Sequence, residues 1–152
     1  MEQKVKNIIL NEAVRRNQII YGATAINRQL PEYLRKETED IDIITKNPKK
    51  HATDIANSLN KELGYEKYKI IPAKHKGTWK VKDIETNKTI ADYTGKIGKK
   101  PNTINVLGNK YADLNSIQRT IKKTLKDEAN AFRFDKDFDT LKRIKEGTKP
   151  IW

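Results

Sequence analysis

The sequence predicts an α+β fold in which helices flank a mixed β-sheet of about five strands. Apolar residues recur at three- and four-residue spacing in several segments of helical length. Short runs rich in β-branched and aromatic residues lie between these segments, and Gly or Pro marks many of the transitions. The chain has 152 residues, the length of one ordinary domain. We expect one domain over residues 1–146 and a short C-terminal tail over residues 147–152.

The N-terminal part of the chain alternates helices with strands. Residues 2–16 place apolar side chains on one helical face. Residues 18–21 are a short β-prone run closed by Gly22, and residues 23–30 continue as a helix that Pro31 stops. Residues 39–45 alternate acidic side chains with isoleucine, which indicates a second strand. Asn47 and Pro48 begin a helix that ends at about residue 63, before Gly64.

The middle of the chain is strand-like, and its C-terminal part is helical. We expect strands at residues 68–72, 78–84 and 89–93, with a hairpin turn at residues 85–88 between the last two. Residues 95–101 form a basic loop, and residues 103–107 are a candidate for a further short strand. Residues 114–125 and 128–145 have helical patterns.

Composition narrows the classes of partner and of metal site. Lys and Arg number 32 against 20 Asp and Glu, a formal charge of +12 that attracts polyanions such as nucleic acid. The alternative is that much of the lysine is ordinary solvated surface. The absence of cysteine excludes disulfides, thiolate metal sites and thiol nucleophiles, and leaves oxygen ligands as the candidates.

The chain shows neither an apolar signal core at its N-terminus nor a stretch near the roughly 20 apolar residues of a membrane helix. We therefore expect a soluble, cytoplasmic protein without a membrane partner.

Two aspartates in the second predicted strand are the first candidates for chemistry. Asp40 and Asp42 are two residues apart, so the pleat of a strand points both carboxylates to one face and Ile41 and Ile43 to the other. Two like charges about 6 to 7 Å apart repel, and a cation between them relieves the repulsion. Mg²⁺ prefers oxygen ligands of this kind. Taken alone, such a pair is more often an ordinary acidic face turned to solvent.

The surrounding sequence strengthens the case for a metal site. Residues 21–24 form a strand-to-helix turn whose free backbone N–H groups and helix dipole suit a triphosphate. Asp92, in the strand at residues 89–93, supplies a third carboxylate.

These segments, in this order, resemble the nucleotidyltransferase superfamily of polymerase-beta type. More narrowly, they look like the nucleotidyltransferase domain of poly(A)-polymerase-like proteins of large DNA viruses. The resemblance is carried by residues 21–27 (YGATAIN), 40–42 (DID), 75–81 (HKGTWKV) and 90–92 (IAD). A weaker similarity extends to Arg133, Lys136, Asp137, Lys142 and Arg143. It implies viral or phage origin, with association with the virion as one option. The chain departs from the family at Ala23, where Gly or Ser is common, and it ends where polyadenylating relatives continue into a further domain.

The resemblance implies a nucleotidyltransferase-like fold and a metal-dependent enzyme that moves a nucleoside monophosphate from an NTP, such as ATP, to a hydroxyl acceptor. A nucleic-acid 3′ end is the favoured acceptor, as in terminal or poly(A)-polymerase-like enzymes, so RNA or DNA is an expected partner. The implied catalytic residues, which also hold two Mg²⁺ or Mn²⁺ ions, are Asp40, Asp42 and Asp92. The implied nucleotide-binding residues are Gly22, Ala23, Thr24 and Asn27. The candidates for nucleic-acid contact are Lys76, Lys96, Lys99 and Lys100.

Other interpretations remain open. The same metal site serves a nucleotidyltransferase that modifies tRNA or a protein in a toxin or defence system, because the fold does not name the acceptor. A non-catalytic module that binds nucleic acid or takes part in virion assembly is a further alternative. Trp79 and Tyr93 are either base-stacking residues or strand core. His75 is either a substrate contact or a turn residue, and His51 is expected at the surface.

Overall fold

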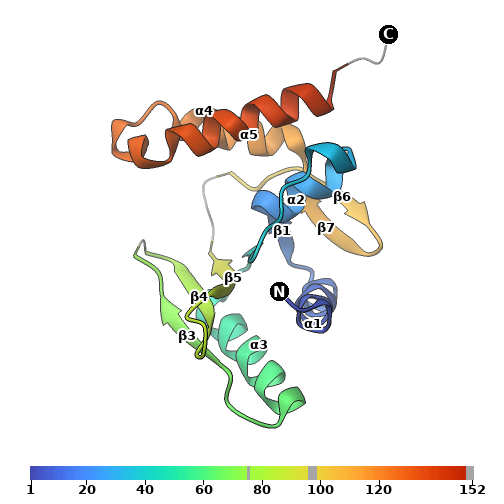
Figure 1. The fold of residues 1–152 in the computed structure, drawn as a ribbon, viewed down its shortest axis with the longest axis vertical. Coiled ribbons are helices and arrows are strands. Elements are labelled where there is room, and N and C mark those ends of the chain that lie inside the picture. Colours follow the sequence, from blue (N-terminus) through green and yellow to red (C-terminus); the bar gives the residue numbers. More distant parts are fainter. Residues whose placement is uncertain (75, 96–98, 150–152) are drawn as a thin grey trace.

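The computed structural model describes residues 1–74, 76–95 and 99–149, which form a seven-stranded mixed sheet flanked by helices (Figure 1). The strands are β1 (Ile19–Tyr21), β2 (Ile41–Ile44), β3 (Tyr68–Pro72), β4 (Thr78–Asp83), β5 (Thr89–Thr94), β6 (Thr103–Val106) and β7 (Asn109–Ala112). The helices are α1 (Gln3–Arg15), α2 (Gly22–Gln29), α3 (Pro48–Leu63), α4 (Leu114–Thr124) and α5 (Phe134–Gly147), with 3₁₀ turns η1 (Glu32–Leu34) and η2 (Glu128–Arg133).

The sheet has the order β3-β4-β5-β2-β1-β7-β6. Strand β2 pairs in parallel with β5, and β1 pairs in parallel with β7, while the other neighbours are antiparallel. This arrangement confirms the predicted α+β class with a mixed sheet and flanking helices. The predicted number of about five strands was wrong, because the β6–β7 hairpin adds two.

Strand β7 escaped prediction because its sequence is short and polar, and its position depends on a tight turn. Leu107 and Gly108 both have positive φ, +52° and +87°, as the two central residues of a two-residue hairpin loop of the primed type require. Asn or Asp is usual at the first of these positions, so Leu107 gives no turn signal. The Asn105 side chain accepts a hydrogen bond from the Gly108 N–H at 3.2 Å, which supports the turn.

The helices match their predicted positions to within one or two residues, except in the C-terminal part. The expected helix over residues 128–145 is divided into η2 and α5. Helix α5 also continues to Gly147, which was assigned to the tail. Gly147 lies so close to Leu30 that an added Cβ would come within 2.5 Å of the leucine side chain. The last three residues of the expected tail, 150–152, lie outside the described part.

Helices α1 and α3 pack against each other and against the sheet, while α2 and α4 contact each other and α4 contacts α5. Figure 1 shows α4 and α5 side by side at one end of the molecule. The core contains Ile41 and Ile43, both with no more than 1% of their surface exposed, as the alternating pattern of the strand predicted. Strand β2 therefore presents isoleucines to the core and Asp42 to its other face. None of the helices among the described residues is long and apolar enough to cross a membrane.

Candidate metal and nucleotide site

Three carboxylates converge where β2 and β5 lie side by side. The parallel pairing sets Asp42 directly opposite Asp92, and Asp40 immediately precedes β2. One carboxylate oxygen from each residue lies within 4.8 Å of the other two. Asp92 is buried, and Asp40 and Asp42 are half-buried. The fold thus brings together three acids that lie up to 52 positions apart in the chain.

The crowding of these acids changes their proton affinity. Burial and the neighbouring charges of Asp40 and Asp92 raise the pKa of Asp42 to about 8. Burial and the hydrogen bond and charge of Asp92 also raise the pKa of Asp40. Carboxylates that repel one another in this way form a site of high negative potential, which a divalent cation with a preference for oxygen ligands fits. The donor set is therefore suitable for Mg²⁺ or Mn²⁺.

Gly22 is required by the close approach of the turn to Asp42. It begins α2 with φ of +66°, and an added Cβ would lie only 2.1 Å from Asp42 Oδ2. The preceding Tyr21 is the register partner of Asp42. The N-cap residue of α2, Tyr21, makes no side-chain capping hydrogen bond to the first-turn N–H groups of the helix. A helix N-terminus beside the carboxylates is suited to bind phosphate.

The other predicted nucleotide-binding residues lie on the same helix, with their polar groups engaged in different ways. The Thr24 hydroxyl donates to the Asp40 carbonyl at 3.4 Å, which ties the turn to the acidic strand. Asn27 is bonded through its amide to the backbone of Lys36, from which it accepts an N–H at 3.0 Å. Asn27 thereby holds the segment that leads to Asp40 against α2. Ala23 is half-buried at the start of the helix.

Two lysines face the carboxylates, and neither was among the predicted site residues. Lys80 is the register partner of Asp92 across β4 and β5, and its Nζ lies 2.9 Å from Asp92 Oδ1. Lys136, on α5, lies close enough for its charge to favour the ionised form of Asp42. Lys80 belongs to the quoted 75–81 segment, but only the strand register shows which acid it pairs with.

Hydroxyl groups lie next to the acids on the same face of the sheet. The Tyr21 hydroxyl donates to Thr94 Oγ1 at 3.1 Å, and Thr94 Oγ1 lies 2.9 Å from Thr78 Oγ1. Burial and the charge of Asp42 raise the pKa of Tyr21 to about 12, so this hydroxyl is protonated at neutral pH. The three residues form a neutral, hydrogen-bonding wall next to the acidic cluster.

Residues 7–108 match the protein family described as the poly(A) polymerase catalytic subunit, and this match covers more than half of the chain. The chain belongs to that family. The family is one of nucleotidyltransferases, which confirms the resemblance seen in the sequence.

Comparison with one solved structure agrees on the fold. The crystal structure of the Megavirus polyadenylate synthase superposes with a TM-score of 0.78 at 18% identity, over 95% of this chain and 31% of that protein. This chain therefore spans about a third of the length of that structural relative. The crystal structure of JHP933 from Helicobacter pylori is a more distant match, with a TM-score of 0.46 at 13% identity over 81% of this chain and 54% of that one. No curated protein matches the chain.

Three of the four predicted contacts to nucleic acid lie among the described residues. Lys76, Lys99 and Lys100 are exposed, whereas Lys96 and His75 lie outside the described residues. Tyr93 has no exposed surface and is core. Trp79, its partner on β4, is only half-buried, and the Lys49 ammonium lies 5.0 Å from the centre of its ring.

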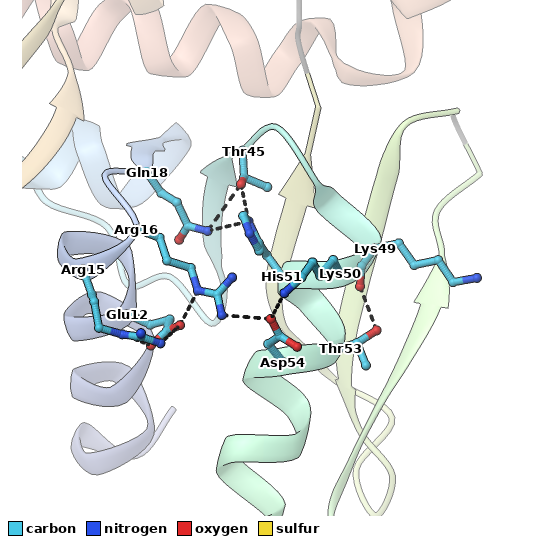
Figure 2. Close-up of polar contacts among 10 residues, drawn as sticks. All are labelled: Glu12, Arg15, Arg16, Gln18, Thr45, Lys49, Lys50, His51, Thr53 and Asp54. Atoms are coloured by element: carbon cyan, nitrogen blue, oxygen red, sulfur yellow. Dashed lines mark hydrogen bonds and ion pairs between the residues drawn. The ribbon is translucent and has the colours of Figure 1, made fainter.

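His51 has a structural role that the sequence did not indicate. Its Nδ1 contacts the Thr45 hydroxyl and lies 3.0 Å from the amide nitrogen of Gln18 (Figure 2). Burial lowers the pKa of His51. These contacts join the start of α3 to the residues next to β1 and β2. His51 keeps part of its surface exposed, as expected of a surface histidine, and also links these elements.

Proposed function

We propose that this chain transfers a nucleoside monophosphate from an NTP to a hydroxyl acceptor, and that the acceptor is the 3′ end of a nucleic acid. The observation that carries the proposal is the convergence of Asp40, Asp42 and Asp92 beside the Gly22 turn at the start of α2. Membership of the poly(A) polymerase catalytic family supports it.

In this proposal Asp40, Asp42 and Asp92 hold two Mg²⁺ or Mn²⁺ ions. When bound, the ions lower the pKa of the acceptor hydroxyl and neutralise the charge that develops on the leaving pyrophosphate. In this proposal Asp92 also accepts the proton of the acceptor hydroxyl.

The nucleotide triphosphate lies against the α2 turn. Gly22 allows the backbone to approach Asp42, and the N–H groups of Ala23 and Thr24 donate to phosphate oxygens. Asn27 supports this region through its bonds to Lys36. The exposed Lys76, Lys99 and Lys100, together with Lys96, attract the phosphate backbone of the acceptor.

A transfer assay tests the proposal. The protein is incubated with each labelled NTP, Mg²⁺ or Mn²⁺, and an RNA, DNA, tRNA or protein acceptor. We expect ATP label on an RNA or DNA strand with a free 3′ hydroxyl and none on the same strand ending in a 3′-deoxynucleotide. Asp92→Asn should abolish the label. Label on a protein, or on tRNA at a position other than its 3′ end, would refute the nucleic-acid 3′ end as acceptor, and full transfer by Asp92→Asn would refute the site.

A further inference from the structure

A basic pocket lies on the face of β4 opposite the carboxylates. It is a shallow, open depression with a volume of about 550 Å³. Its walls come from the first turns of α3 and the segment before them, and from Trp79. Since neighbouring residues of a strand point to opposite faces, Trp79 lies opposite Lys80, which pairs with Asp92. Only the thickness of the sheet separates the pocket from the carboxylate cluster.

The charges in this pocket are arranged to leave two cations free for a polyanion. Asp54 is the acid among the lining residues, and it is bonded to Arg16 at 2.8 Å and to Lys50 at 2.9 Å. Figure 2 shows Lys50 and Asp54 facing α1, while Lys49 extends in the opposite direction, toward the strands. Lys46 and Lys49 are exposed and line the opening. The pocket is therefore positively charged around an aromatic ring.

Trp79 is the feature that favours single-stranded nucleic acid over a simple anion. Its indole packs on the core with one side and is half-exposed, with the Lys49 ammonium 5.0 Å from the ring centre. Lys49 is on a flexible, exposed side chain, so it can leave the ring for a phosphate when a base arrives. Aromatic rings beside lysines are the elements from which proteins build binding sites for single strands.

The pocket lies beside the β3–β4 hairpin end that carries Lys76. The Gly77 carbonyl accepts a hydrogen bond from the Gly95 N–H at 2.9 Å. Pro48, the first residue of α3, packs against Gly95, where an added Cβ would lie 3.5 Å from its Cγ. The hairpin end, the end of β5 and the start of α3 therefore meet. A strand can pass from the pocket around this end of the sheet, past Lys76, toward Asp92.

From this arrangement we propose that the pocket formed by Lys46, Lys49 and Trp79 binds the acceptor strand upstream of its 3′ end, with one base on the indole and the lysines on neighbouring phosphates. This inference rests on the proposed function for the identity of the strand as acceptor. The binding itself requires neither metal nor NTP.

Tryptophan fluorescence tests the proposal. Trp152→Phe leaves Trp79 as the single tryptophan, because the chain has two. The probe is an oligoadenylate of about 15 nucleotides, long enough for a typical single-strand site, titrated in EDTA without NTP. We expect quenching of Trp79 that saturates together with binding measured by anisotropy. Binding without a change in Trp79 fluorescence would overturn the proposal, as would the absence of binding.

A pair of charge-matched variants locates the contact. Each of two phosphate contacts contributes about 0.7 to the salt dependence of single-strand binding, so Lys46→Ala/Lys49→Ala should lower the slope by about 1.4. If the two proteins bind equally at 1 M salt, this difference in slope makes the variant bind roughly 25-fold more weakly than the wild type at 0.1 M. Lys61→Ala/Lys145→Ala changes the net charge equally, at exposed positions toward the far end of α3 and of α5. Equal losses in both pairs would refute a specific site.

This design separates the two proposals. If the protein transfers nucleotides but Trp79 does not respond to the strand, the pocket proposal fails alone. If Trp79 responds and no acceptor is extended, the proposed transfer activity fails alone.

Discussion

Replacing Asp42 with asparagine tests whether the three carboxylates repel one another as the geometry indicates. The substitution keeps the size of the side chain and removes one negative charge from the cluster. Two unit charges 4.8 Å apart interact by roughly 3 kcal/mol at an effective dielectric constant near 20. We therefore expect Asp42→Asn to stabilise the metal-free protein by roughly 3 kcal/mol at pH 8.

The sign of the pH dependence follows from the direction of the pKa change. The pKa of Asp42 rises from 3.8 in an unfolded chain to about 8 in the fold. The folded state therefore binds more protons than the unfolded state between these values, and stability is lost as the pH rises from about 4 to 8. The asparagine variant lacks this loss, so its advantage should be near zero at pH 4 and largest at pH 8.

Urea unfolding followed by circular dichroism, in EDTA, measures the difference across this pH range. Glu66→Gln, at an exposed position, is the control for removing one negative charge and should change stability by less than about 0.5 kcal/mol. Added Mg²⁺ should stabilise the wild type more than Asp42→Asn. An asparagine variant that is no more stable than the wild type at pH 8 in EDTA would refute the reasoning.

Three further substitutions probe the Gly22 turn, the Lys80–Asp92 pair and the contacts of His51. Gly22→Ala should cost at least about 2 kcal/mol of stability in urea more than Gly64→Ala, because both glycines have positive φ but only Gly22 has Asp42 within 4 Å of an added Cβ. Lys80→Met should tighten Mn²⁺ binding measured by paramagnetic resonance about three- to tenfold, since it removes a competing cation. Lys82→Met, on the same strand, should not, and equal effects would contradict the pairing. Because burial lowers the pKa of His51, its contribution to stability should fade as the pH drops below 6.5, and His51→Gln should remove that dependence from urea unfolding curves.

The sequence was sufficient to predict most of the helices and strands and to pick out the three aspartates that lie together in the structure. Alternation in β2 predicted both the buried Ile41 and Ile43 and the outward Asp42, because a strand has only two faces. The Gly22 turn was recognisable as a strand-to-helix junction. The reason why this position requires glycine could not be recognised from the sequence, because the clash with Asp42 depends on the pairing of β1 with β2.

The register between β4 and β5 shows why the positions of Lys80 and Trp79 could not be predicted from the sequence. The pairing shifts by one residue between Val81 and Lys82. Near the turn, Lys82 pairs with Thr89. If that register continued along the strands, Trp79 would lie opposite Asp92, and each face of the hairpin would carry a different set of side chains. The irregularity sets Lys80 beside Asp92 and turns Trp79 toward α3. No residue pattern in the hairpin predicts this shift.

The most direct test of the central claim is the position of bound metal. Crystals soaked with Mn²⁺ and a non-hydrolysable ATP analogue would locate the ions by anomalous scattering. The account predicts two manganese ions about 3.5 to 4 Å apart, ligated by Asp40, Asp42 and Asp92, with the triphosphate against the Gly22 turn. Manganese bound elsewhere, or a triphosphate away from α2, would contradict it.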